Sequence, residues 1–203
     1  EACLVGSEMC IRDRSILVSL MEPYKDRNLI GLIAKQNITC FALELIPRIT
    51  RAQTMDVLSS QSNLAGYKAV IEASTTYGKA FPMMMTAAGT VPPAKCLVIG
   101  AGVAGLQAIA TARRLGAVVS ASDVRPAAKE NVESLGAKFI AVEDEEFKQA
   151  ETSGGYAKEM SDEYKKKQTE LIAATVAKQD IIICTALIPG KPAPVLLLSL
   201  IHI

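Results

Sequence analysis

The sequence predicts an α/β protein with a doubly wound parallel sheet, preceded by part of a second α/β subdomain. An apolar run over residues 96–99 leads into the glycine turn Gly100–Gly105, which opens a helical pattern over 103–115. A second apolar run, 117–121, leads directly to Asp123. Strand, glycine turn, helix, strand and acid in this order are typical of a Rossmann-like dinucleotide-binding unit.

Each glycine of this turn has a physical task. Gly100 permits the tight turn, Gly102 lets the backbone approach a pyrophosphate, and Gly105 lets the helix pack close to the sheet. The first helical turn offers unpaired N–H groups and a positive dipole end to phosphates. Asp123 is placed to accept hydrogen bonds from the adenosine ribose. The alternative is a glycine turn without a ligand, but the acid favours binding.

Periodicity predicts further elements on both sides of this unit. Before it we expect a buried strand, a helix, a second strand, a polar loop or short helix, a long helix and a linker, at residues 16–20, 27–36, 38–45, 49–60, 63–79 and 81–93. The linker methionines Met83–Met85 are expected to fill the core. The nucleotide sheet has strands at 95–99, 118–121, 138–141 and 181–185, and helices at 127–135 and 165–178. A complete doubly wound sheet has about six strands, so we expect a truncated sheet.

Four segments are expected along the chain. Residues 15–85 form the C-terminal part of the first subdomain with its linker helix, and residues 86–195 form the incomplete nucleotide-binding domain. Residues 1–14 and 196–203 have no clear periodicity and resemble translated sequencing-adapter read-through. We therefore expect them to be non-native tails.

Composition excludes several other classes of protein. The 203 residues carry a net charge of +1 and half are hydrophobic, so nothing points to nucleic acid. No apolar run reaches the roughly 18 residues of a membrane-spanning helix. None of the five cysteines forms a C-x-x-C pair, and Cys40, Cys96 and Cys184 lie in or beside apolar runs. This pattern predicts buried thiols in a reducing compartment and no metal site.

Several longer segments together resemble one family. They are PRITRAQTMDVLSSQSNLAG at 47–66, FPMMMTAAGTVPP at 81–93, GAGVAGLQAIATA at 100–112, GYAKEM at 155–160 and ALIPGKPAP at 186–194. Their sequence, order and spacing resemble the α subunit of the proton-translocating NAD(P) transhydrogenases, in the alanine dehydrogenase/transhydrogenase superfamily. The resemblance covers residues 15–195 and points to the extramembrane, NAD(H)-binding domain I.

The resemblance implies an activity and partners. Domain I binds NAD(H) and donates hydride from NADH to NADP⁺ on a partner domain, and a transmembrane domain couples this to proton translocation. It also implies a homodimer at the cytoplasmic face of the inner membrane, or on the matrix side in mitochondria. As a fragment, the chain is expected to be inactive alone.

The resemblance also assigns residues beside the nicotinamide. The loop with Arg48, Gln53 and Asp56 matches the family's Arg-Gln-Asp loop, in which Gln53 positions the two nicotinamides. Arg48 and Asp56 support it as an ion pair, and Ser59 bonds the carboxamide. From the residues alone, this segment is equally a polar turn with an ordinary Arg–Asp pair.

The remaining assigned residues surround the rest of the nucleotide. Gly155 and Tyr156 match a mobile loop that closes over it, although a solvated flexible loop is the alternative. Residues expected to line the adenosine and pyrophosphate are Val103, Val124, Arg125, Gln168 and Leu187. Arg125 could also clamp a 2′-phosphate, but Asp123 opposes that and favours NAD(H).

The chemistry fits a site without histidine. The single histidine, His202, lies in the suspected tail. Hydride transfer between two nicotinamides needs no proton acceptor, whereas alcohol and amine dehydrogenases need one. Alanine dehydrogenase, the nearest alternative, carries His-Leu-Ala where this chain has residues 18–21, which contain no histidine. A non-catalytic NAD-binding module is the third possibility.

Overall fold

The structure, a computed structural model, describes residues 14–47, 49–142, 144, 147, 161–187, 193 and 195–197. The chain divides into two compact units, Glu1–Gln61 and Ser62–Ile203, and each is described by itself. The division falls inside helix α2 (Val57–Tyr77), earlier than the expected boundary at 85/86. The reason is packing, because Val70 of α2 is fully buried in the core of the second unit.

The first unit contains the expected strand–helix–strand segment. Strands β1 (Ile16–Ser19) and β2 (Thr39–Ala42) pair in parallel, with α1 (Arg27–Lys35) between them in sequence. The Asp26 carboxylate caps α1 by accepting a hydrogen bond from the Leu29 N–H at 2.9 Å. β2 is shorter than expected, since residues 43–45 form the 3₁₀ helix η2 (Leu43–Leu45).

One face of the β1–β2 pair is exposed, contrary to the expectation of a buried strand. Helix α1 packs on the other face through a cluster that contains Ile33 and Ile38. Side chains of the exposed face remain accessible, with Ile16 at 70%, Val18 at 57% and Phe41 at 58%. The apolar run correctly predicts a strand, but no described element of this unit covers its second face.

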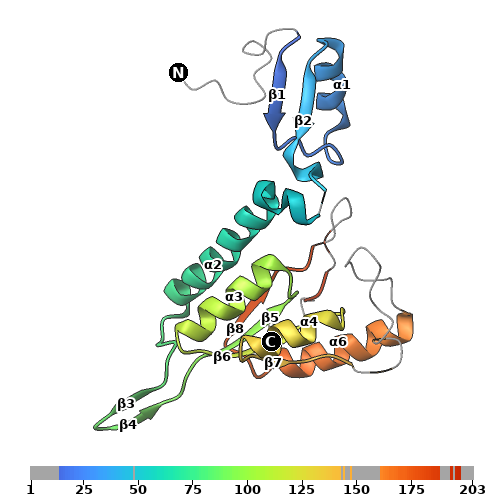
Figure 1. Ribbon diagram of the computed structural model, residues 1–203. Coiled ribbons are helices and arrows are strands. Elements are labelled where there is room, and N and C mark those ends of the chain that lie inside the picture. Colours follow the sequence, from blue (N-terminus) through green and yellow to red (C-terminus); the bar gives the residue numbers. More distant parts are fainter. Residues whose placement is uncertain are drawn as a thin grey trace. The chain divides into compact units, whose positions relative to one another are not determined.

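The second unit is built on a four-stranded parallel sheet in the order β7-β6-β5-β8 (Figure 1). The strands are β5 (Lys95–Ile99), β6 (Val118–Ser122), β7 (Lys138–Phe139) and β8 (Ile181–Cys184). The chain runs outward from β5 through β6 to β7, then returns to pair β8 with the other side of β5. This reversal confirms the doubly wound topology, and its switch point lies between β5 and β8.

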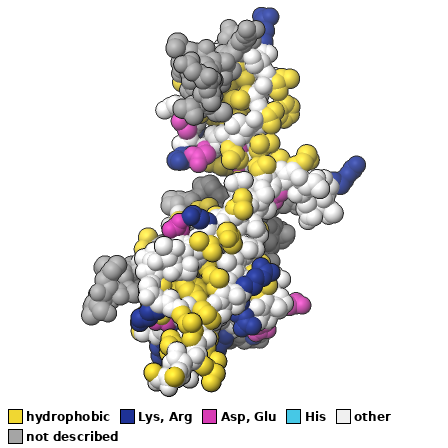
Figure 2. All heavy atoms as spheres, turned by 90° about the vertical axis from the view of Figure 1, so that its left-hand side faces the viewer, with side chains coloured by type: hydrophobic (Ala, Val, Ile, Leu, Met, Phe, Trp, Pro, Cys, Tyr) yellow, Lys and Arg dark blue, Asp and Glu magenta, His cyan; other side chains and the backbone are white. Residues whose placement is uncertain are grey.

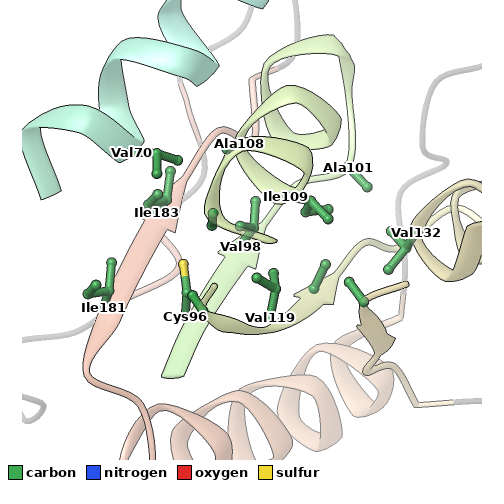
Figure 3. Close-up of a cluster of buried hydrophobic side chains, with 14 of the residues drawn as sticks. Val70, Cys96, Val98, Ala101, Ala108, Ile109, Val119, Val132, Ile181 and Ile183 are labelled. Carbon is green, nitrogen blue, oxygen red and sulfur yellow. The ribbon is translucent and has the colours of Figure 1, made fainter. Parts of the chain in front are cut away.

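Apolar side chains cover both faces of this sheet, as a doubly wound fold requires. The helices are α3 (Val103–Arg114), α4 (Ala127–Ser134) and α6 (Asp162–Val176). On one face a cluster joins strands to α2, α3 and α4 and includes Val70, Cys96, Val98, Ile109, Val119, Val132 and Ile183 (Figure 3). On the other face Leu97 and Ile99 pack against Ile172 and Val176 of α6. The strand β5 is therefore buried on both sides.

The predicted linker contains an antiparallel hairpin, so the expectation of a linker with core methionines is wrong. Strands β3 (Met84–Thr86) and β4 (Gly89–Val91) pair with Met84 opposite Val91. The turn uses Gly89 at φ +128°, and the Thr86 hydroxyl donates to the Gly89 carbonyl oxygen at 2.9 Å. Met83–Met85 are exposed, with Met85 at 82%. Short strands without alternating polarity gave no periodic signal.

The three described cysteines differ in exposure. Cys96 is buried as expected, but Cys40 and Cys184 are exposed, so the prediction of buried thiols is wrong for these two. Burial raises the pKa of the Cys96 thiol to about 12. Burial also raises the pKa of Cys184. A raised pKa means less reactive thiolate at a given pH.

Alkylation rates therefore test this part of the fold. With iodoacetamide at pH 8, we expect Cys40 to react fastest, Cys184 more slowly, and Cys96 only after denaturant is added. Peptide mass spectrometry after timed quenching separates the sites. Rapid labelling of Cys96 in the folded protein would contradict the buried β5 strand.

Candidate nucleotide-binding site

The carboxyl ends of three neighbouring strands are joined by hydrogen bonds at one edge of the sheet. The Gly100 N–H, after β5, donates to the Ser122 carbonyl oxygen of β6 at 2.8 Å. The Thr185 hydroxyl, after β8, donates to the Gly100 carbonyl oxygen at 2.7 Å. This edge at the switch point is where open α/β sheets bind ligands.

The three glycines have different structural demands. Gly100 adopts φ +96°, and a Cβ there would lie 2.8 Å from the Ala186 nitrogen. A Cβ on Gly105 would lie 1.8 Å from the Gly100 carbonyl oxygen. Nothing lies within 4 Å of the position of a Cβ on Gly102. The tasks predicted for Gly100 and Gly105 are thus present in the structure, and Gly102 faces open space.

Helix α3 begins at this turn with an uncapped N-terminus. Its N-cap residue is Gly102, and no side chain caps it. The N–H groups of the first turn have no partner within the helix itself, and they combine with the helix dipole to favour an anion. The arrangement fits a pyrophosphate, since Gly102 leaves room for close approach.

Asp123 lies at the end of β6 and is already fully engaged within the chain. Its Oδ2 accepts hydrogen bonds from the Ala101 N–H at 2.7 Å and from Arg125 Nη2 at 2.9 Å. Its Oδ1 accepts from the Arg125 N–H at 2.8 Å and from Arg125 Nε at 3.0 Å. The carboxylate side chain is only 7% exposed. A ribose hydroxyl would therefore have to replace one of these donors.

The other residues predicted to surround the nucleotide vary in exposure. Val103 and Leu187 are exposed, and Val124, Arg125 and Gln168 are half-buried. Gly155 and Tyr156 lie outside the described residues. The exposed valine belongs to the first turn of α3 and the leucine follows Thr185, so both are in segments that flank the turn.

A separate small pocket occurs in the first unit. Its volume is about 200 Å³, and it is lined by Pro47, Ile49, Ala52, Gln53, Asp56 and Ser59. Three of the four residues predicted to act beside the nicotinamide therefore share one pocket. The fourth, Arg48, lies outside the described residues. The expected polar loop is the 3₁₀ helix η3 (Thr50–Met55) followed by the start of α2.

Hydrogen bonds fix the shape of this pocket. Asp56 Oδ1 accepts from the Ser59 N–H at 2.9 Å, and Oδ2 accepts from the Ser59 hydroxyl at 2.6 Å. Asp56 thereby caps the N-terminus of α2. Gln53 is exposed, and its side-chain amide has no hydrogen-bond partner among the described residues. Gln53 is thus the polar group that remains available to a ligand.

Sequence reasoning missed three residues that shape these regions. Thr185 ties β8 to the glycine turn, although a hydroxyl after a buried strand is a readable signal. A Cβ on Gly66 would lie 2.0 Å from the Ala104 carbonyl oxygen, so this glycine permits close approach of α2 and α3. Glu44 accepts hydrogen bonds from the backbone N–H groups of Met21, at 2.7 Å, and Glu22. Only packing reveals the last two.

Comparison with protein families identifies the chain. The model described as "Alanine dehydrogenase/PNT, C-terminal domain" matches residues 69–200, and its N-terminal counterpart matches residues 5–65. The chain belongs to the alanine dehydrogenase/PNT family. The resemblance and the Rossmann-like fold expected from the sequence are both confirmed.

Transhydrogenases are among its similar relatives. The chain is 62% identical over 187 residues to the first part of the NAD(P) transhydrogenase subunit alpha of Rhodospirillum rubrum, covering 92% of the chain and 49% of the relative. It is 58% identical over 182 residues to the protein of the same name from Rickettsia prowazekii, covering 90% and 47%. The chain thus spans about half the length of these relatives.

Solved structures agree with this family. The structure titled "The crystal structure of transhydrogenase from Sinorhizobium meliloti" matches with a TM-score of 0.83 and 60% identity, covering 94% of the chain and 50% of that structure. An L-alanine dehydrogenase matches with a TM-score of 0.68 at 20% identity, covering 95% and 47%, which shows a shared fold. Among the described helices, none is both long and apolar enough to cross a membrane.

Two glycine substitutions separate packing from space for a ligand. Gly105→Ala should destabilise the folded protein toward the upper end of about 1–3 kcal/mol, because its methyl group overlaps a backbone carbonyl. Gly102→Ala should change stability by less than about 1 kcal/mol, since its position is open. Urea denaturation measures both. Equal destabilisation by the two substitutions would contradict the geometry of this turn.

Proposed function

We propose that this chain binds NAD(H) at the glycine turn and donates hydride from NADH to NADP⁺ held on a partner domain. Transfer is coupled to proton translocation through a transmembrane domain of the same enzyme. The observation that carries the proposal is the open space at Gly102, beside an uncapped α3 at the switch point of the sheet. High identity to transhydrogenase α subunits supports it.

Residues of the turn bind and orient the nucleotide. The first-turn N–H groups of α3 hold the pyrophosphate, and Asp123 accepts from the adenosine ribose after exchanging a donor. Val103, Val124, Arg125, Gln168 and Leu187 line the adenosine and pyrophosphate. Gly155 and Tyr156 close over the bound nucleotide, which retains it and excludes water.

Residues of the Gln53 pocket act at the nicotinamide. Bound NADH supplies a hydride from C4 of its nicotinamide to C4 of the nicotinamide of NADP⁺, so no proton moves in this step. The Gln53 amide orients the two rings, and Ser59 bonds the carboxamide. Arg48 and Asp56 hold the loop that carries Gln53. The task is alignment and exclusion of water, which needs no histidine.

An alanine dehydrogenase-like soluble oxidoreductase is the second candidate, because the fold is shared. The identity of 62% to transhydrogenase subunits favours the first. A non-catalytic NAD-binding module is distinguished by assay, because it would bind NADH without reducing an NADP⁺ analogue. We propose that the chain alone does not turn over, because the NADP(H)-binding domain is a separate partner.

The partners follow from the same proposal. The NADP(H)-binding and transmembrane domains complete the enzyme, and the chain lies at the cytoplasmic face of the inner membrane, or on the matrix side in mitochondria. We further propose a homodimer. Residues 80–94 carry no charge, and hydrophobic side chains gather on the hairpin β3–β4 at the lower end of the view in Figure 2. A second copy of this chain can cover this surface.

Nucleotide binding is tested at Gly102. In the full-length polypeptide that carries this sequence, Gly102→Ala should weaken NADH binding at least tenfold, because its methyl group occupies the space needed by the pyrophosphate. Fluorescence titration gives the dissociation constant. Ser74→Ala, which removes an α2 hydroxyl bonded to the Ile71 carbonyl oxygen, is the control and should bind normally. Unchanged binding in the glycine variant would exclude this turn as the phosphate site.

Hydride transfer is tested at Gln53. In the assembled enzyme, Gln53→Ala should lower the transfer rate at least tenfold and leave NADH affinity within about twofold, since the amide aligns the rings and contributes little binding. Stopped-flow reduction of an NADP⁺ analogue measures transfer. Gln61→Ala, on α2, is a matched control. A wild-type rate in the Gln53 variant would remove this residue from the site.

The homodimer is tested at the hairpin. Met84→Lys together with Met85→Lys should convert dimer to monomer, because two buried charges without partners oppose association. Sedimentation velocity of the full-length polypeptide measures the state, and Lys79→Met is the control. A dimer that persists in the double variant would place the interface elsewhere.

A further inference from the structure

Asp123 and Arg125 form a closed ion pair at the edge of the proposed site. Arg125 approaches through Nε and Nη2, one on each carboxylate oxygen, at 3.0 and 2.9 Å. The backbone N–H groups of Arg125 and Ala101 fill the remaining positions at 2.8 and 2.7 Å. A carboxylate offers about four acceptor sites, and four donors are present. The acid is therefore saturated without a nucleotide.

This pairing changes the charge that a nucleotide meets. The Asp123 side chain is 7% exposed and the Arg125 side chain 27% exposed, so solvent reaches mainly the guanidinium. A bidentate pair is close to neutral as a unit, and its carboxylate is not an isolated negative charge. Repulsion by Asp123 alone is thus an incomplete reason for rejecting the 2′-phosphate of NADP(H).

We propose that Asp123 sets coenzyme choice by restraining Arg125, which is a latent phosphate-binding group. While both oxygens of Asp123 hold the guanidinium, its donors are directed away from a 2′-phosphate. A free guanidinium binds phosphate with the same fork geometry that it uses for a carboxylate. The inference rests on the proposed binding of NAD(H) at this edge.

The restraint also defines how NADH itself enters. A ribose hydroxyl takes one acceptor site from Arg125, and this exchanges one hydrogen bond for another at little cost in free energy. A 2′-phosphate cannot make this exchange, because it has no hydrogen to donate to the carboxylate when ionised. The pair therefore accepts a hydroxyl and rejects a phosphate, although it contains an arginine.

Four forms of the full-length polypeptide, purified without partner subunits, test this inference. Dissociation constants for NADH and NADPH are measured by fluorescence for wild type, Asp123→Asn, Arg125→Gln and the double variant. We expect Asp123→Asn to bind NADPH about tenfold tighter than wild type and NADH more weakly, since a charge-assisted bond is released. The double variant should lose the NADPH gain. Arg125→Gln should lower NADPH affinity below wild type, because its acid is unpaired.

Each outcome decides between defined interpretations. An equal NADPH gain in Asp123→Asn and the double variant would overturn the role of Arg125, as would unchanged NADPH affinity in Arg125→Gln. Asp123→Ser provides a second release of the guanidinium, and thermal melting checks that the variants fold. Wild type that fails to bind NADH contradicts the proposed function itself. Wild type that binds NADH, with no NADPH gain in the acid variants, contradicts only this inference.

Discussion

The hydrogen bonds that tie β6 and β8 to the glycine turn after β5 determine the rest of the candidate site. The Thr185 hydroxyl reaches the Gly100 carbonyl oxygen, and the Asp123 carboxylate reaches the Ala101 N–H. These contacts come from segments more than twenty and eighty residues away, so they form only when the parallel sheet has assembled. The turn that approaches a phosphate is therefore a product of the whole sheet.

Close approach of backbones adds a second constraint. Gly105 lets α3 begin directly over the Gly100 carbonyl oxygen, and Gly66 lets α2 cross α3 at Ala104. Both contacts exclude even a methyl group. Helix α3 is thus fixed from two sides, which keeps its uncapped N-terminus at the sheet edge. Rigid placement of these N–H groups matters because donors that are already oriented lose little entropy on binding a phosphate.

The sequence predicts the parts of this architecture that depend on short-range patterns. The apolar run 95–99, the Gly100–Gly105 turn and Asp123 lie within one βαβ unit, so spacing alone predicts their arrangement. The contacts of Thr185 and Gly66 could not be predicted, since each depends on a segment distant in sequence. The hairpin at Met84–Val91 escaped because three-residue strands carry too few side chains to show a period.

The Asp123–Arg125 pair shows where the reading of a motif by residue type is incomplete. An acid after the second strand predicts a ribose contact, and an arginine two residues later predicts a phosphate contact. Each residue considered alone gives an opposite coenzyme preference. The structure resolves the conflict by joining them, because the carboxylate holds the guanidinium through both oxygens. Coenzyme preference at this edge is therefore a property of the pair and of the Ala101 N–H that orients it, and neither charge determines it alone.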